Sequence, residues 1–261
     1  MKLDQLQMDQ AGEIARSIRD ARRLVVFTGA GISTESGIPD FRSPGGLWTK
    51  YDPEDFTIQK FLRSPEARRM QWRVLAESGL MADAEPNRAH NAVAELEKMG
   101  KLDCVITQNI DNLHQKAGNS PEIIFELHGN MGRAVCLACG AHYPMPEVVK
   151  QLKKDGEPEC GACCGMLKPD VVLFGESLPA DVLREATLRS NRCDLFIVIG
   201  SSLAVYPAAY MPAYAREAGA KLVIINAGAT TYDHHAHILA NAGAGDMMEE
   251  VMNRLRGLLW E

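Results

Sequence analysis

Four short runs of small and polar residues each follow an apolar segment of strand length. They are Gly29-Ala30-Gly31, Gln108-Asn109-Ile110-Asp111, Gly200-Ser201-Ser202 and Asn226-Ala227-Gly228. Small residues let a phosphate approach the backbone N–H groups, while amide and carboxylate side chains recognise polar ligand groups. Ligands of parallel sheets lie outside the carboxyl ends of the strands, so we predict that the four runs line one crevice. The alternative is that each run is only a turn at a strand end.

The first run opens a longer polar stretch, residues 28–48. Gly29 and Gly31 match the first two positions of the dinucleotide fingerprint G-x-G-x-x-G, but Thr34 occupies the third. Beyond the turn the stretch carries a carboxylate, an aromatic ring and a guanidinium, on Asp40, Phe41 and Arg42. Because so polar and glycine-rich a segment is a poor core element, we expect it to contact a ligand.

Two cysteine pairs have the spacing of a metal site. Cys136 and Cys139 are followed, after an interval of 20 residues, by Cys160 and Cys163. Two such pairs supply the four thiolates of a tetrahedral Zn²⁺ site, which leaves no open position for water and is therefore structural. Cys164 could replace Cys163 by a shift of one residue, and we favour Cys163.

His128 is the candidate acid–base group, because imidazole exchanges protons near neutral pH and the adjacent Gly129 leaves it accessible. The alternative is a structural histidine. Asn109 and Asp111 would face the same way on an extended segment, unless they form a turn or a helix cap. The remaining histidine cluster is interpreted as part of a surface loop: His234, His235 and His237.

The scaffold for these residues follows from the apolar pattern. Apolar segments at 24–27, 104–107, 195–199 and 222–225 predict strands, and the pattern predicts helices over 14–22, 89–99, 208–218 and 247–259. Strands that are apolar throughout and alternate with helices indicate an α/β fold with a parallel sheet covered on both faces.

Bulk properties exclude several functional classes. The 261 residues are 46% apolar and 24% charged, with a formal net charge of −6 and no block of like charges, so nothing indicates a nucleic-acid surface. No apolar run is long enough to span a bilayer, and the first residues lack the apolar core of a secretion signal. We therefore expect a cytoplasmic protein with no membrane partner.

These motifs, in this order, resemble the sirtuins, NAD-dependent protein deacylases. The resemblance runs from about residue 21 to 248 and rests on GAGIS with ESGIPDFR, TQNIDNLH, LHGN, the cysteine pairs, KPDVVLFGE, GSSLAVYP and NAG. It implies a Rossmann-like domain formed by 1–42, 86–130 and 170–261, a helical module with a cofactor loop at 43–85, and a zinc ribbon at 131–169. NAD and an acyl-lysine peptide would enter the cleft between them.

The resemblance also implies roles for individual residues toward NAD. The pyrophosphate would be held by Gly29, Ala30, Gly31 and Ser33, with Asp40 and Arg42 nearby and Phe41 over the nicotinamide pocket. Gln108 and Asn109 would orient the nicotinamide ribose, and Ile110 and Asp111 would bind the carboxamide. The rest of the cofactor set is Gly200, Ser201, Ser202, Asn226, Ala227, Gly228 and, at the adenine edge, Met247.

Catalysis and substrate binding are implied in the same way. The acyl oxygen would attack the ribose, and His128 would act as general base on the ribose hydroxyls, giving lysine, nicotinamide and O-acetyl-ADP-ribose. Val172 and Phe174 would line the acyl tunnel, and the backbone of Gly175 and Glu176 would pair with the peptide as an added strand.

Trp72 and Leu75 stand about where sirtuins that prefer acidic acyl groups carry a tyrosine and an arginine. An apolar pair cannot neutralise a carboxylate, so we predict neutral acyl substrates. Two other functions fit the same motifs: ADP-ribosyl transfer to protein, and a non-catalytic NAD-sensing module. An ordinary dehydrogenase fits poorly, because the glycine fingerprint is incomplete. We expect a monomer.

Overall fold

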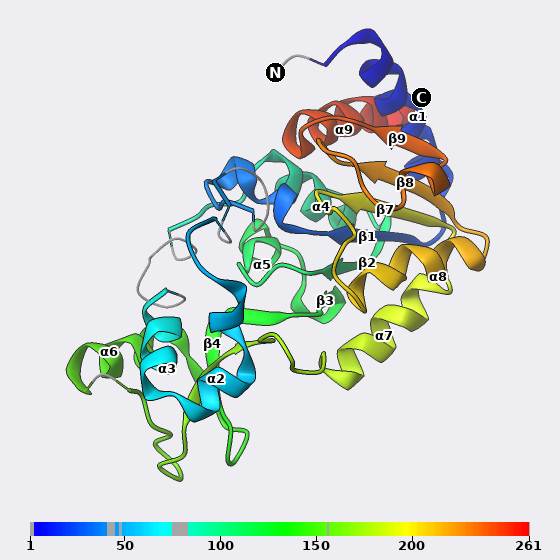
Figure 1. Cartoon of the computed structure of the whole chain (residues 1–261). Coiled ribbons are helices and arrows are strands. Elements are labelled where there is room, and N and C mark those ends of the chain that lie inside the picture. The colour runs from blue at the N-terminus through cyan, green and yellow to red at the C-terminus, as the bar shows by residue number, and fades with distance from the viewer. Residues whose placement is uncertain (1–2, 41–44, 47–48, 75–82, 156, 261) are drawn as a thin grey trace.

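The structure is a computed structural model that describes residues 3–40, 45–46, 49–74, 83–155 and 157–260. Its centre is a six-stranded parallel sheet in the order β3-β2-β1-β7-β8-β9 (Figure 1). The strands are β1 (Leu24–Thr28), β2 (Leu102–Thr107), β3 (Ile124–Glu126), β7 (Leu195–Ile199), β8 (Lys221–Ile225) and β9 (Ile238–Ala240). This is the strand order of the Rossmann fold, as the alternation of strands and helices predicts.

Alternate residues of each central strand enter different core layers. Leu24 and Val26 of β1 pack toward α1 (Gln5–Asp20), α4 (Arg88–Lys98) and α9 (Ala244–Trp260), whereas Val25 and Phe27 pack toward α7 (Ala180–Ser190) and α8 (Met211–Glu217). Every residue of β1 and β7 is buried. A sheet covered on both faces requires strands that are apolar throughout, which is why the sequence carries unbroken apolar runs instead of an alternating pattern.

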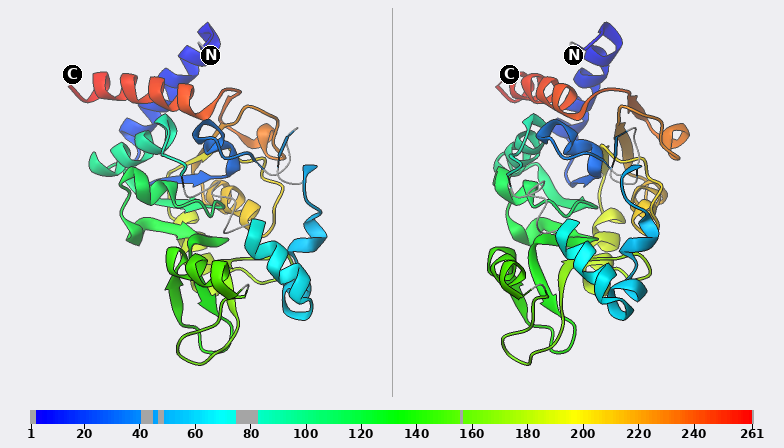
Figure 2. Two further views of the ribbon diagram at one scale, coloured as in Figure 1. Left: turned by 90° about the vertical axis from the view of Figure 1, so that its left-hand side faces the viewer. Right: turned by 60° about the vertical axis from the view of Figure 1, so that its left-hand side comes forward.

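A second, smaller sheet is antiparallel, in the order β5-β4-β6. It contains β4 (Gly129–Cys136), β5 (His142–Pro144) and β6 (Leu167–Val171), with α6 (Met145–Asp155) packed beside it. Its core also takes Phe61 of α2 (Ile58–Arg63) and Trp72 of α3 (Pro65–Trp72). Figure 2 shows this sheet and the two helices at the end of the molecule away from α1 and α9.

The remaining elements are short. They are α5 (Leu113–Ala117) and the 3₁₀ turns η1 (Ala30–Ile32), η2 (Thr34–Ser36), η4 (Pro53–Phe56), η6 (Pro121–Ile123), η7 (Ala208–Tyr210) and η8 (Asp233–His235). Among the described residues, no helix combines the length and the apolar character needed to cross a membrane.

The structure corrects two predicted helices. The first ends at Asp20 instead of residue 22, because Ala21 adopts an extended conformation. The predicted helix over 208–218 is divided into η7 and α8, since Pro212 in the first turn of α8 has no N–H to continue a helix from the preceding turn. The predicted helices at 89–99 and 247–259 correspond to α4 and α9.

Candidate functional site

The strand order reverses between β1 and β7, and the backbone segments that follow these strands touch there. The N–H of Gly29 donates to the carbonyl of Ile199 at 3.1 Å, and the N–H of Gly31 donates to that of Gly200 at 2.8 Å. A Cβ on Gly31 would lie 2.8 Å from the Cα of Gly200, which itself has a φ of +65°. Gly31 and Gly200 are therefore required because a side chain at either position would collide with the backbone of the other loop. They lie at the reversal of strand order, where open α/β sheets bind ligands.

All four polar runs border one cavity of about 470 Å³ outside the carboxyl ends of the strands. The predicted residues that line it are Ala30, Gly31, Asp40, Gln108, Asn109, His128, Gly200, Ser201, Ser202, Asn226, Ala227 and Gly228. The prediction that the runs meet in one crevice is confirmed. Sequence reasoning missed other lining residues: Thr34, Glu35, Ala204, Val205, Ala229, Ala242, Gly243 and Ala244. Most are small residues next to a predicted run or before α9, and nothing in their type distinguishes them.

Ser33 lies behind the cavity lining and connects two of the runs. It is 1% exposed, and its hydroxyl donates to Oδ2 of Asp111 at 2.7 Å. The side-chain amide of Asn109 donates to Oγ of Ser33 at 3.1 Å and to the carbonyl of Gly29 at 3.2 Å. Asp111 also accepts the N–H of Leu113 at the start of α5. The β1 loop and the β2 loop are thus fixed to each other by buried hydrogen bonds.

Besides Ser33, four described residues predicted to bind the cofactor lie outside the lining: Gly29, Ile110, Asp111 and Met247. Met247 is fully buried in the core layer formed with α1 and α4. The carbonyl of Ile110 accepts the N–H of Met131 at 2.8 Å, which joins the β2 loop to β4.

His128 lies between β3 and β4 and borders the cavity. Its Nδ1 is 2.9 Å from the carbonyl of Gln108, an acceptor, so Nδ1 carries the proton and Nε2 the lone pair. Burial lowers the pKa of His128, and the hydrogen bond to Gln108 opposes this in part. The side chain of Gln108 accepts the hydroxyl of Ser201 at 2.8 Å, which ties the end of β2 to the end of β7. The arrangement gives a neutral imidazole able to accept a proton at Nε2.

The predicted acyl and peptide residues follow β6 and reach both parts of the molecule. The N–H of Val172 donates to the carbonyl of His128 at 2.9 Å. Phe174, which is 44% exposed, donates its N–H to the carbonyl of Phe56 and accepts the N–H of Ile58, both at 3.0 Å. Gly175 has a φ of +85°, and the side chain of Glu176 accepts from Lys168.

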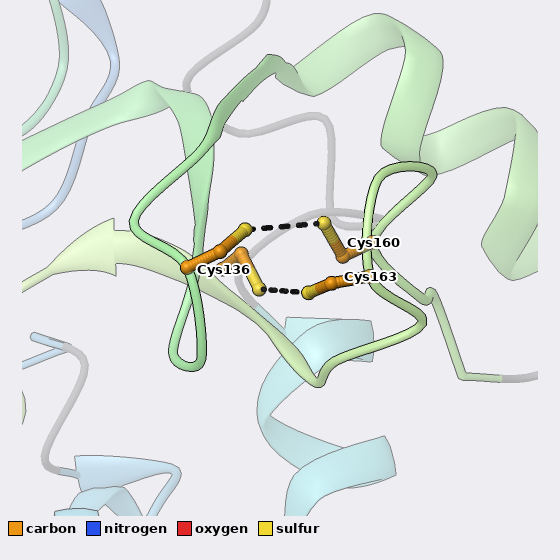
Figure 3. A group of neighbouring side chains, drawn as sticks. Cys136, Cys160 and Cys163 are labelled. Carbon is orange, nitrogen blue, oxygen red and sulfur yellow. Dashed lines mark hydrogen bonds between the residues drawn. The ribbon is translucent and has the colours of Figure 1, made fainter.

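The four predicted thiols converge. The sulfur atoms of Cys136, Cys139, Cys160 and Cys163 all lie within 4.8 Å of one another. Figure 3 shows the labelled side chains pointing toward a common centre. Two of the sulfur pairs are 3.6 Å apart, close to the roughly 3.8 Å expected for thiolates around tetrahedral Zn²⁺ with bonds of about 2.3 Å. The donor set fits a structural zinc ion, and Cys164 is outside it, exposed and with a φ of +57°.

Three predicted residues, Phe41, Arg42 and Leu75, lie outside the described part of the chain. Trp72 is described, and its side chain is buried in the core of the small sheet.

His90 and His114, to which the sequence assigned no role, are buried behind the site. Their rings are 5.1 Å apart at an interplanar angle of 66°, and Nε2 of His114 is 3.0 Å from Oγ1 of Thr28. Burial lowers the pKa of His90 to about 4 and that of His114 to about 3. His234 and His235 occupy η8 between β8 and β9, in agreement with the predicted loop.

Known proteins with a similar sequence or structure belong to one family. The sequence profile of the Sir2 family matches residues 29–207. NAD-dependent protein deacetylase 1 of Pyrobaculum aerophilum is 46% identical over 253 residues, which are 97% of each chain. A solved Sir2 structure with a p53 peptide and NAD⁺ is 41% identical, with a TM-score of 0.84 over 95% of this chain and 98% of that one. Another, with a deacetylated p53 peptide and 3′-O-acetyl-ADP-ribose, is 42% identical, with a TM-score of 0.85 over 92% and 96%. The chain belongs to the Sir2 family, the sirtuins.

Proposed function

We propose that this protein is an NAD-dependent protein lysine deacetylase. It converts an acetyl-lysine peptide, NAD and water to lysine, nicotinamide and O-acetyl-ADP-ribose. The observation that carries the proposal is His128, held in its Nδ1–H tautomer by Gln108 at the edge of a cavity lined by four strand-end runs. The family and the names of its relatives support the same reaction.

The cofactor side of the cavity suits a dinucleotide. Gly31, Gly200 and Ser201 bring backbone to the switch point without side chains that would exclude a pyrophosphate. Asn226 and Gly228, which follow β8 and line the cavity, are assigned to the adenosine end of the ligand. NAD supplies the ribose carbon to which the acyl oxygen bonds as nicotinamide leaves.

Asn109 and Asp111 are assigned to the ribose and carboxamide of nicotinamide, and both are held by Ser33. Because their side chains are fixed before a ligand binds, little conformational entropy is lost when they engage it.

His128 removes a proton from a ribose hydroxyl, so that the hydroxyl oxygen can attack the carbon of the former acyl group. The imidazole must be neutral for this step. Since burial lowers the pKa of His128 below its ordinary value of 6.5, the base is unprotonated at neutral pH. We expect kcat/KM to fall only when the pH falls below 6.5, as the imidazole gains its proton.

The test is mass spectrometry of the products formed from NAD and an acetyl-lysine peptide. A deacetylase releases nicotinamide and O-acetyl-ADP-ribose in equal amounts, whereas nicotinamide with an ADP-ribosylated protein would indicate transfer instead. His128→Ala should lower kcat by a factor of about 10²–10⁴, the usual contribution of a general base. NAD binding without any turnover by the wild-type protein would contradict the proposal and indicate a sensing module.

We further propose a monomer that acts in the cytoplasm on acylated proteins, with no nucleic-acid or membrane partner. The net charge of −6 supports the absence of a nucleic-acid partner. We also propose a division of the chain into a Rossmann-like domain at 1–42, 86–130 and 170–261, a helical module with a cofactor loop at 43–85, and a zinc ribbon at 131–169. The helical module contributes Phe61 and Trp72 to the core that it shares with the small sheet.

A further inference from the structure

A partly buried ion pair spans the end of β6 and the segment that follows it. We call residues 171–176 the edge segment, because the proposed function assigns Val172, Phe174 and Gly175 in it to the acyl-peptide. Lys168 of β6 is 5% exposed, and its ammonium group donates to Oε2 of Glu176 at 2.9 Å. It also donates to the carbonyl of Val171 at 2.5 Å. The ammonium group therefore connects the first residue of the edge segment to the last.

Glu176 completes the connection from the other side. The Oε2 atom that accepts from Lys168 also accepts the N–H of Leu173 at 2.7 Å, and the N–H of Glu176 donates to the carbonyl of Leu173 at 3.0 Å. Leu173 is only 4% exposed, so its N–H requires a partner inside the protein. One carboxylate oxygen thus serves both the buried ammonium group and the turn.

The connection decides which side chains of the edge segment reach the substrate. Val171 and Leu173 are buried in the core of the small sheet, whereas Phe174 is exposed and Val172 is partly exposed. Because side chains alternate along an extended segment, a slip of one residue would exchange the two sets. Residues 171–174 are all apolar, so the hydrophobic pattern by itself does not distinguish this register from one shifted by a single residue.

The same segment touches the catalytic histidine. The N–H of Val172 donates to the carbonyl of His128, and Phe174 pairs with Phe56 and Ile58 on the opposite side. The edge segment is therefore held between His128 and η4. Lys168 connects it to β6, the strand that follows the second cysteine pair. A displacement of the segment would alter the distance between the acyl group and His128.

We propose that Lys168 and Glu176 are positioning residues for the acyl-peptide: the ion pair between the buried lysine and the partly exposed glutamate fixes the edge segment in the register that presents Val172, Phe174 and the backbone at Gly175 to the substrate. This inference rests on the proposed deacetylase function. It assigns a role to the side chain of Glu176, beyond the backbone pairing expected from the sequence.

The experiment compares Lys168→Met, Glu176→Gln and a control, Lys221→Met. Lys221 forms an exposed ion pair with Glu13 at the amino end of β8, so the control removes a lysine charge far from the cleft. For each variant KM is measured separately for an acetyl-lysine peptide and for NAD. Peptide binding is measured without turnover by fluorescence anisotropy, and Tm and zinc content are recorded.

For Lys168→Met we expect KM and Kd for the peptide to rise at least fivefold, while KM for NAD stays within twofold. Glu176→Gln keeps an oxygen for Leu173 and Lys168 but loses the charge, so its effect should have the same direction and a smaller size. If Lys168→Met does not fold, the Glu176→Gln variant still tests the inference. Lys221→Met should match the wild type.

Two results would overturn the inference. The first is peptide binding at the wild-type level in both variants. The second is a rise of the KM for the peptide and the KM for NAD by the same factor, together with a lower Tm, which would indicate a general structural role. If the wild-type protein neither binds nor deacetylates the acetyl-lysine peptide, the proposed function itself fails, and the positioning role fails with it. Unchanged variants of an active wild type reject the positioning role alone.

Discussion

Gly200 offers the sharpest test of how the backbone forms the site. It follows β7, has a φ of +65°, and a Cβ there would approach the carbonyl carbon of Gly31 to 2.5 Å. An alanine at this position takes a left-handed conformation that costs roughly 1–2 kcal/mol. Forcing a methyl group against packed backbone adds about 1–3 kcal/mol. We therefore expect Gly200→Ala to lower the free energy of unfolding by roughly 2–5 kcal/mol.

Gly219 provides the matched control, because it has a φ of +91° but, within the described part of the chain, a Cβ there would meet no atom beyond its chain neighbours within 4 Å. Gly219→Ala should lose only the conformational part, roughly 1–2 kcal/mol. For a protein of this size each kcal/mol lowers Tm by roughly 2–4 °C, so the two variants should differ by several degrees. The difference isolates the steric contact between the β7 and β1 loops.

The assay is thermal unfolding followed by circular dichroism, with and without NAD, and calorimetric titration of NAD. Since a methyl group at Gly200 displaces Gly31 in the cavity lining, we expect NAD affinity to fall at least tenfold in that variant and to stay unchanged in Gly219→Ala. Equal losses of Tm in the two variants, or wild-type NAD affinity in Gly200→Ala, would refute the reasoning.

Three further predictions concern the histidines, the metal and the acyl group. Below pH 6.5 the unfolded chain protonates His90, whose folded pKa is about 4, so His90 alone should lower the free energy of unfolding by about 1.4 kcal/mol per pH unit between these values. Urea unfolding at pH 7, 6 and 5 should show a smaller slope in His90→Asn but not in the control His142→Asn, which alters an exposed side chain; equal slopes would contradict the assignment. Cys163→Ser should lower bound zinc below one equivalent by mass spectrometry, whereas Cys164→Ser should retain it, and the reverse would exclude the assigned ligand set. Because Val172 and Phe174, the residues assigned to the acyl group, are apolar and cannot neutralise a carboxylate, kcat/KM should be higher for an acetyl-lysine than for a succinyl-lysine peptide, and faster succinyl removal would disprove this.

The large sheet was predictable because its strands are apolar throughout. The runs at 195–199 and 222–225 lie in β7 and β8, and the residues after them line the cavity as expected. By contrast β3, β9 and α5 are only three to five residues long, too short to show a hydrophobic period. The small sheet was expected only as the zinc ribbon that the resemblance to the sirtuins implies, because β5 and β6 carry little apolar pattern of their own.

Within the site, the sequence identified residues whose chemistry is local, such as His128 and the cysteine pairs. It assigned no role to Lys168, since the contacts of its ammonium group with the carbonyl of Val171 and the carboxylate of Glu176 form only when the segment after β6 turns back. His90 and His114 could not be identified from the sequence either, because their burial depends on contacts between α4, α5 and the sheet. That burial lowers their pKa values.

The residue types of the site and their spacing can be read from the sequence alone: glycines at strand ends, four thiols in two pairs, and one imidazole beside a glycine. These are properties of neighbouring residues, fixed by backbone freedom and side-chain chemistry. Only the tertiary structure decided how they meet. The reversal of strand order between β1 and β7 brings Gly31 against Gly200, and the carbonyl of Gln108 selects the tautomer of His128. Such contacts join segments far apart in the chain, and their geometry depends on the packing of the whole sheet.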